Sequence, residues 1–405
     1  MREFRFGVIA CVVTVMCVVT AGAQTFTVLH RFGFKTDGQR PTGGLTWGPG
    51  DTVLFGTTTV GGTYNAGTVF QISPSGRETV LYSFGAGADA VLPAASLARG
   101  PGGTLYGTSE AGGEFKRGTV FKLAKVGNTV QETVVYSFQG GTDGYNPESG
   151  LVWDSAGNLY GTTGNGGGGT ACYLGCGTVF KIDATTGQET VLYAFQGSPD
   201  GANPPRGLVR DSAGNLYGTT TSGGASNNGT VFMLSPSGQE TILHSFTGAP
   251  DGAGPWDGLL RDAAGNLFGT TSEGGTGTNF ECAGVGCGTV FEVTSSGVES
   301  LLYSFSGAIN DDEGFPWGGL VEDSAGNLYG TTAGEGSGNS ACVTNGGCGT
   351  IFKLDPAGKL TTLHNFSFSD GAWPWPTLTM DPSGNLYGTT LDGGLKIGTV
   401  FKLTP

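Results

Sequence analysis

The sequence has few charged residues and very few histidines. Lys and Arg total 19, Asp and Glu total 33 and His totals three among 405 residues, which gives a formal net charge of −14. No basic cluster interrupts this acidic background, so nucleic acid and anionic membrane surfaces are poor partners. The sequence also lacks Gly-x-Ser-x-Gly, His-Glu-x-x-His and Walker-type motifs. We therefore assign no catalytic residue, no metal ligand set and no cofactor from motifs.

The chain also lacks a long apolar segment beyond its first residues. A charged start at residues 2–5 precedes an apolar run from Phe6 to Val19, and small residues at 21–23 precede Gln24. This order is typical of a secretory signal peptide, and the run is short for a membrane span. We therefore expect residues 1–23 to be a signal peptide and residues 24–405 to form one mature domain. That domain should have no membrane span and should be extracytoplasmic, either periplasmic or secreted.

Glycine is abundant, at 78 residues, but it does not recur at every third position. Collagen is therefore excluded, and so is a helical protein. Hydrophobic residues make up 37% of the chain and aromatic residues 10%, which is enough to fill a core.

Three short motifs each occur seven times in the same order. Copies of Tyr-Gly-Thr-Thr have their glycine at Gly56, Gly107, Gly161, Gly218, Gly269, Gly330 and Gly388. Copies of Gly-Thr-Val-Phe begin at Gly67, Gly118, Gly177, Gly229, Gly288, Gly349 and Gly398. Copies of Leu-Tyr-Ser-Phe end at Phe32, Phe84, Phe138, Phe195, Phe246, Phe305 and Phe366. One unit is therefore about 55 residues long, in the range of propeller blades.

The unit reads as four short strands separated by glycine-rich turns, as in Asp154-Ser155-Ala156-Gly157-Asn158. The mature chain opens with a lone fourth strand, residues 26–32, and ends with a third strand at residues 400–403. Pairing these two segments would complete the seventh unit and remove the exposed sheet edges. We therefore predict an all-β fold: a seven-bladed β-propeller with four-stranded blades, closed by the N-terminal strand in the last blade.

The sequence of the repeat resembles that of a known family. Gly-Leu-Val-x-Asp-Ser-Ala-Gly-Asn-Leu-Tyr-Gly-Thr-Thr, at residues 150–163 and 207–220, followed by Gly-Thr-Val-Phe, resembles the GloVer tandem repeat of exported bacterial proteins. The resemblance covers essentially the whole mature chain. It implies the propeller fold and export, and it implies no activity. Gly48 and Gly100 stand where later units have the turn aspartate.

Six cysteines lie in three lengthened loops, each between the Tyr-Gly-Thr-Thr and Gly-Thr-Val-Phe motifs of its unit. In an exported protein, a close pair within one loop most simply forms a disulfide. The expected pairs are Cys172 with Cys176, Cys282 with Cys287, and Cys342 with Cys348. The alternative, a metal tetrathiolate assembled from two blades, has no nearby histidine to support it.

Histidine and aspartate recur at fixed repeat positions. His30, His244 and His364 each replace the Tyr of the Leu-Tyr-Ser-Phe strand, which favours a packing role over a general base. Aspartates recur between the fourth strand of one blade and the first strand of the next, which favours turn capping over paired carboxylates for glycoside chemistry. They are Asp37, Asp143, Asp200, Asp251, Asp312 and Asp370.

One position varies while its neighbours do not. Each unit enters its first strand through a proline, and the residue after it is Thr42, Ala94, Glu148, Pro205, Trp256, Trp317 or Trp375. Tryptophan beside carboxylate suits stacking on a sugar ring, although tryptophans could instead wedge between blades. The candidate ligand-binding residues on the loop face of blades five to seven are Trp256, Trp317, Trp373, Trp375, Asp251, Asp311, Asp312, Glu313 and Asp370.

Calcium is an alternative ligand for Asp311, Asp312 and Glu313, on the ground of their hard oxygen atoms. The sequence as a whole favours a monomeric, non-catalytic binding or surface-scaffold propeller that recognises an extracellular glycan or peptide. The alternative is a polysaccharide-acting hydrolase or lyase that uses loop carboxylates. The fold does not decide between the two.

Overall fold

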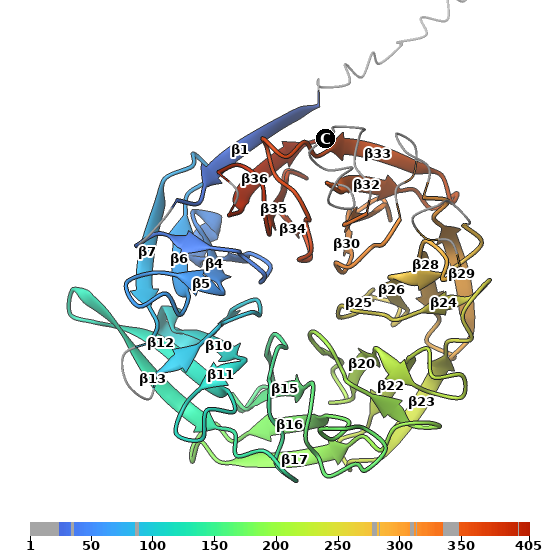
Figure 1. Ribbon diagram of the computed structural model, residues 1–405, viewed down its shortest axis with the longest axis horizontal. Helices are drawn as coiled ribbons and strands as arrows, with labels where there is room; N and C mark the ends of the chain where they lie inside the picture. The colour runs from blue at the N-terminus through green and yellow to red at the C-terminus, as the bar shows by residue number, and fades with distance from the viewer. Residues whose placement is uncertain are drawn as a thin grey trace, which may run out of the picture.

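The computed structural model describes residues 24–405, except 34–35, 86–88, 278–281, 283, 308–311, 313, 335–347 and 396. Within these residues, seven four-stranded antiparallel sheets surround a central axis (Figure 1). The prediction of a seven-bladed β-propeller is confirmed. The predicted signal peptide at residues 1–23 lies outside the described residues.

Each blade runs from a short inner strand near the axis to a longer outer strand at the rim. Blade 1 contains β3 (Thr46–Trp47), β4 (Leu54–Thr58), β6 (Thr68–Ile72) and β7 (Glu78–Ser83). Blade 2 contains β9 (Ala98–Arg99), β10 (Leu105–Ser109), β12 (Thr119–Val126) and β13 (Thr129–Ser137). Blade 3 contains β14 (Val152–Trp153), β15 (Leu159–Thr163), β16 (Thr178–Ile182) and β17 (Glu189–Ala194). Blade 4 contains β19 (Val209–Arg210), β20 (Leu216–Thr220), β22 (Thr230–Leu234) and β23 (Glu240–Ser245).

The remaining blades follow the same order. Blade 5 contains β25 (Leu260–Arg261), β26 (Leu267–Thr271), β28 (Thr289–Val293) and β29 (Glu299–Ser304). Blade 6 contains β30 (Val321–Glu322), β31 (Leu328–Thr332), β32 (Thr350–Leu354) and β33 (Leu360–Asn365). Blade 7 contains β34 (Thr379–Met380), β35 (Leu386–Thr390) and β36 (Thr399–Thr404), with β1 (Thr25–Arg31) as its outer strand.

The ring closes by pairing of the first described strand with the last strand of the chain, as predicted. Strand β1 pairs antiparallel with β36, from Thr25 opposite Thr404 to Arg31 opposite Thr399. Phe32, which follows β1, is fully buried. The seventh blade is therefore built from residues that are almost the full chain length apart, and closure satisfies the strand edges that each end would otherwise expose.

The repeated motifs fill the inside of each blade. The glycine of Tyr-Gly-Thr-Thr lies under the phenylalanine of the next strand: a Cβ at Gly56 would lie 2.4 Å from Cζ of Phe70. The last Thr or Ser of this motif forms a buried hydrogen bond with the Thr of Gly-Thr-Val-Phe, as between Thr58 and Thr68 at 2.8 Å. Because the same contacts recur in every blade, the motifs act as the core of the repeat.

Phenylalanines also join neighbouring blades. The residue that ends each outer strand motif packs edge to face on the third-strand phenylalanine of the next blade, with ring centroids 5.0–5.3 Å apart. The seven pairs are Phe32–Phe70, Phe84–Phe121, Phe138–Phe180, Phe195–Phe232, Phe246–Phe291, Phe305–Phe352 and Phe366–Phe401. This geometry suits the aromatic quadrupole and buries both rings.

The hairpin between the first two strands of a blade is closed by the predicted aspartate turn. Asp154 accepts hydrogen bonds from the backbone N–H groups of Ala156 and Asn158 and from the Tyr160 hydroxyl. In blades 1 and 2, where Gly48 and Gly100 replace this aspartate, short 3₁₀ turns take its place at η1 (Pro49–Asp51) and η2 (Pro101–Gly103).

Two loops of each blade lie on the same face of the disc. Short antiparallel pairs join the connection that enters a blade to the loop between its second and third strands. These pairs are β2 (Gly38–Gln39) with β5 (Val60–Gly61), β8 (Ala90–Val91) with β11 (Ala111–Gly112), β18 (Gly201–Ala202) with β21 (Ser222–Gly223), and β24 (Gly252–Ala253) with β27 (Glu273–Gly274). We call this side the loop face.

Candidate functional site at the mouth of the central channel

A strained backbone position precedes the first strand of every blade. The residue before the entry proline has a positive φ, between 55° and 61°, in all seven blades: Arg40, Leu92, Asn146, Asn203, Gly254, Phe315 and Trp373. Six of the seven are not glycine, and such residues rarely adopt this conformation. The surrounding structure must therefore hold this backbone conformation, and such strained residues are often found at functional sites.

Backbone hydrogen bonds supply that hold. The N–H of each of these residues donates to the carbonyl just before the Gly-Thr-Val-Phe motif, as from Arg40 to Ile397 at 2.9 Å. Its carbonyl accepts from the residue after Tyr-Gly-Thr-Thr, as in the 3.1 Å bond from the Glu110 N–H to Leu92. Because only backbone atoms are involved, the side chains at and near this position are free to differ between blades.

The residue after the entry proline faces the axis on the loop face. These residues, which we call the mouth ring, are Thr42, Ala94, Glu148, Pro205, Trp256, Trp317 and Trp375. All except Ala94 line one cavity of about 390 Å³ together with Arg40, Glu110 and Arg206, and Ala94 lines the channel below it. The position that varies between repeats is thus the position that surrounds the channel mouth.

The three tryptophans of the mouth ring stack on one another. The rings of Trp256 and Trp317 are 5.3 Å apart with an interplanar angle of 4°, and those of Trp317 and Trp375 are 5.0 Å apart at 20°. None of the three is buried, and Trp256 is 41% exposed. The stack joins neighbouring blades and lines the mouth cavity. Trp317 is covered on both faces, whereas Trp256 ends the stack beside Pro205.

Charged residues occupy the other side of the mouth. Glu148 accepts a 2.6 Å hydrogen bond from Asn146 Nδ2, and Arg206 donates through Nη1 to the Thr42 carbonyl at 3.0 Å. Burial, followed by the nearby charge of Glu148, raises the pKa of Glu110 to about 7, and Arg206 opposes this rise. Two carboxyl groups, of which Glu110 has a raised pKa, and one guanidinium therefore line the mouth cavity together with the aromatic stack.

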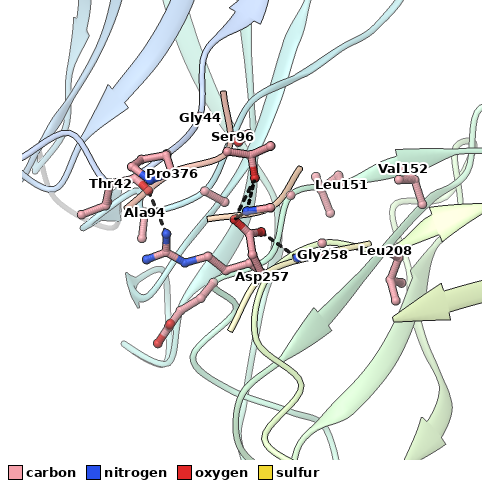
Figure 2. A pocket seen from close by; sticks show the side chains of 18 of the residues that line it. Thr42, Gly44, Ala94, Ser96, Leu151, Val152, Leu208, Asp257, Gly258 and Pro376 are labelled. Carbon is pink, nitrogen blue, oxygen red and sulfur yellow. Dashed lines mark hydrogen bonds between the residues drawn. The ribbon is translucent and has the colours of Figure 1, made fainter. Parts of the chain in front are cut away.

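A second cavity of about 240 Å³ continues along the channel and holds Asp257, one residue after Trp256. Its carboxylate accepts hydrogen bonds from the Thr377 hydroxyl at 2.7 Å and from the backbone N–H groups of Gly319 and Gly258 at 2.8 and 2.7 Å (Figure 2). Burial raises the pKa of Asp257, and Arg206 and these hydrogen bonds oppose the rise. Asp257 places an acid group deep in the channel and ties blades 5, 6 and 7 together.

The structure does not bring the candidate aspartates to the tryptophans. Asp251 and Asp370 lie 3.1 and 3.4 Å from His244 and His364, and Asp312 accepts hydrogen bonds from Tyr303 and Ser306. Trp373 is the pre-proline residue of blade 7 and does not line the mouth cavity. Asp311 and Glu313, and with them most of the candidate calcium site, lie outside the described residues.

These aspartates belong to contacts that repeat at each junction between blades. The Tyr or His of an outer strand contacts the aspartate of the loop that follows it, as in the 3.0 Å bond from the Tyr82 hydroxyl to Asp89. The aspartate also accepts a backbone N–H, as from Thr247 to Asp251 at 2.9 Å. The packing role predicted for the histidines and the capping role predicted for the aspartates are supported. Asp89 fills this role in blade 1, which the Asp-Gly pattern missed.

The disulfide loops are connected to the mouth ring. Cys172–Cys176 and Cys282–Cys287 are bonded as predicted. Cys348 is also in a disulfide, and its predicted partner Cys342 lies outside the described residues. The carbonyls of Cys176, Cys287 and Cys348 accept the N–H of the pre-proline residues Asn203, Phe315 and Trp373. Each disulfide therefore braces the backbone that presents a residue of the mouth ring.

Glu110 and Arg206 were not among the residues predicted for the site. Glu110 follows Tyr-Gly-Thr-Ser in its repeat, where the other blades carry Thr59, Gly164, Thr221, Ser272, Ala333 and Leu391. Arg206 lies one position after the mouth ring, where other blades have mostly small residues. Both positions vary between repeats, which is a sequence signal that marks the two residues but not their convergence at the mouth.

The fold and the site together define this protein as a seven-bladed propeller whose channel mouth is lined by aromatic and charged residues. The Gloeobacter/Verrucomicrobia repeat model matches residues 14–174, 86–282, 168–343 and 277–405. The chain belongs to this repeat family, as its motifs predicted. No curated protein matches the chain in sequence.

Several solved structures share the fold at low sequence identity. The GH74 enzyme of Niastella koreensis is 15% identical with a TM-score of 0.58, over 93% of this chain and 53% of the enzyme. A Bacteroides uniformis protein described as a 6-phosphogluconolactonase is 18% identical with a TM-score of 0.53, over 83% of this chain and 88% of its own. PorZ, a surface component of the type-IX secretion system of Porphyromonas gingivalis, is 14% identical with a TM-score of 0.50, over 87% of this chain and 45% of PorZ. These likenesses show the fold alone. Among the described residues, no helix has the length and apolar character needed to cross a membrane.

Proposed function

We propose that this protein is an exported, non-catalytic binding propeller that holds a carbohydrate at the mouth of its central channel. The observation that carries the proposal is the position of Trp256. Its ring ends the tryptophan stack, is 41% exposed and borders the cavity that Glu110, Glu148 and Arg206 also line. A sugar ring presents an apolar face and hydroxyl groups on its edge, so an aromatic plane opposite charged hydrogen-bonding groups suits it.

The size of the mouth supports a small ligand or the end of a chain. A cavity of about 390 Å³ falls in the usual range of small-molecule sites. The disulfide loops and the backbone hydrogen bonds of the pre-proline residues hold the wall of the mouth cavity in place before a ligand binds. This lowers the entropy cost of binding. A peptide with an aromatic or basic side chain is the other class of ligand that this wall could take.

The test is a glycan array with the mature protein, followed by calorimetry with the oligosaccharide that binds best. Trp256→Ala should lower its affinity at least about tenfold, a loss of about 1.4 kcal/mol. Tyr173→Ala is the matched control, because Tyr173 is a 99% exposed aromatic residue in a disulfide loop outside the mouth cavity. Equal losses in both variants, or binding that survives Trp256→Ala, would contradict the proposal.

The second candidate is a polysaccharide-acting hydrolase or lyase. One observation favours it: Glu110, whose pKa is raised to about 7, lines the same cavity as Glu148, and cleavage of a glycosidic bond uses two carboxyl groups, one of which acts as an acid with a raised pKa. The GH74 likeness is a likeness of fold and adds nothing to this argument. Release of reducing ends from an array-selected glycan, abolished by Glu110→Gln and Glu148→Gln, would establish this alternative. Binding of the glycan without its cleavage would support the binding function and contradict the hydrolase or lyase alternative.

Export forms part of the same proposal. Its support is the N-terminal pattern at residues 1–23, together with the disulfides, which form and persist outside the reducing cytosol. The protein should be a monomer that leaves the cytoplasm for the periplasm or the medium. Fractionation with N-terminal sequencing tests this: a mature start at Gln24 is expected, and retention of Met1 in the cytosolic fraction would contradict it.

A further inference from the structure

The junctions between blades contain a second set of repeating polar contacts, far from the channel mouth. Each junction joins three positions: the Tyr or His of an outer strand, the aspartate that follows that strand, and the residue that begins the outer strand of the next blade. In the junction from blade 7 to blade 1 these are His30, Asp37 and Glu78, and from blade 4 to blade 5 they are His244, Asp251 and Glu299. Figure 1 shows that the outer strands β1 and β7, and likewise β23 and β29, follow one another around the rim.

These two junctions differ from all the others in the groups they combine. Their ligand atoms, one imidazole nitrogen and two carboxylate oxygens, lie within 4.8 Å of one another. At the junctions that begin at Tyr82, Tyr136, Tyr193 and Tyr303, a phenol replaces the imidazole. At the junction from blade 6 to blade 7, His364 is present but Phe26 takes the place of the glutamate and stacks on the imidazole, with ring centroids 3.6 Å apart.

We propose that the triplets His30–Asp37–Glu78 and His244–Asp251–Glu299 each bind one divalent transition-metal ion, for which Zn²⁺ is the probe. Imidazole nitrogen with carboxylate oxygen is a ligand set that such ions accept, whereas Ca²⁺ prefers oxygen alone. The ion would link the outer strands of two neighbouring blades.

The distances fit this assignment. Zinc–ligand bonds of about 2.0–2.1 Å in a tetrahedron place neighbouring ligand atoms about 3.4 Å apart. His30 Nε2 lies 3.3 Å from Asp37 Oδ2, and His244 Nε2 lies 3.1 Å from Asp251 Oδ2, so two ligands of each triplet already stand at this spacing. The glutamate oxygen of each triplet lies within 4.8 Å of both of these atoms.

The surroundings leave the glutamates available and orient the aspartates. Oε1 of both Glu78 and Glu299 is buried and has no hydrogen-bond partner among the described residues. Asp37 accepts the Gly33 N–H at 2.6 Å, and Asp251 accepts the Gly252 N–H at 2.7 Å, so both carboxylates are held in place by the backbone. Such outer contacts fix the direction of metal ligands. The histidines remain about one-fifth exposed, which leaves access for the ion and for a water ligand.

The test uses the whole mature protein, stripped with EDTA and titrated with ZnCl₂ in a calorimeter. Two equivalents should bind. His30→Tyr and His244→Tyr, which install the residue that other junctions carry, should each leave one equivalent, and the double variant should leave none. His364→Tyr is the matched control and should still bind two. Zinc should raise the Tm of the native protein and should not raise that of the double variant.

Glu78→Gln provides a second measurement that keeps the histidine. It should weaken zinc binding at the first triplet by at least about tenfold while the second triplet still binds. Two equivalents bound by the double tyrosine variant, an equivalent lost in His364→Tyr, or no zinc bound by the native protein would each overturn the proposal. Binding of Ca²⁺ with the same stoichiometry would overturn the ligand assignment. None of these outcomes depends on the channel mouth, so the two proposals are tested separately.

Discussion

The two halves of the channel mouth are built on one backbone and carry opposite chemistry. Blades 5, 6 and 7 contribute Trp256, Trp317 and Trp375, whereas blades 2, 3 and 4 contribute Glu110, Glu148 and Arg206. The pre-proline residue beneath each half has the same positive φ and the same two backbone hydrogen bonds. The repeat therefore sets where a side chain stands, and the few positions that differ between blades set what the mouth can bind.

The largest expected effect concerns the frame that both halves share. Deleting residues 24–32 removes β1, exposes the edge of β36 and uncovers the core beside Phe70, so we expect aggregation or a large fall in Tm. Size-exclusion chromatography and calorimetry measure this. Deleting Pro405 alone, which is exposed and outside β36, is the control and should change little. A monomeric truncated protein with unchanged Tm would contradict the closed ring.

The next largest effect is expected from a substitution that extends the aromatic half of the mouth toward the charged half. Pro205→Trp places a fourth indole beside Trp256 and covers its free face, so carbohydrate affinity should fall about tenfold. The Tm should stay nearly constant, because Pro205 is partly exposed and its carbonyl contact to Thr162 does not depend on the side chain. Calorimetry with the array-selected glycan measures the affinity. Unchanged or tighter binding would show that the ligand does not use that face.

These two predictions differ in how far the sequence alone supports them. The closure follows from the split repeat, and the mouth ring follows from one position that varies among fixed neighbours. The convergence of Glu110 and Arg206 could not be predicted, because it depends on which loop positions point to the axis, and that depends on strand tilt and on the conformation of the pre-proline residue. The aspartates at 251, 312 and 370 were grouped with the tryptophans by their nearness in sequence, although their side chains contact the outer strands near the rim.

A smaller effect concerns the charged half of the mouth, where carbohydrate affinity should depend on pH. With its pKa near 7, Glu110 changes from mostly neutral to mostly charged between pH 6 and 8, and a carboxylate accepts hydrogen bonds from sugar hydroxyls more strongly than a carboxylic acid does. Native affinity should therefore rise several-fold over this range, and Glu110→Gln should bind more weakly with little pH dependence. Glu114→Gln, on an exposed loop of the same blade, is the control. A native affinity that is flat with pH would exclude Glu110 from the ligand contacts.

The smallest effect concerns the junctions that contain tyrosine. Burial, followed by the charge of the neighbouring aspartate, raises the pKa of Glu132 to about 8 and those of Glu189 and Glu240 to about 7. A pKa raised in the folded state stabilises the fold at low pH, and this contribution is lost as the pH rises through 7 to 8. The Tm should fall by about 5 °C or less between pH 5.5 and 8.5, since these groups are partly exposed. The triple Gln variant should show a smaller slope, and a native Tm that rises with pH would contradict the assignment.

The backbone anchoring of the pre-proline residues also has a use in protein engineering. Because backbone hydrogen bonds hold each of the seven pre-proline residues, a combinatorial library could randomise the residues that follow the prolines. The molecule would then display seven variable side chains around one axis, on a scaffold whose neighbouring blades are joined by paired phenylalanines.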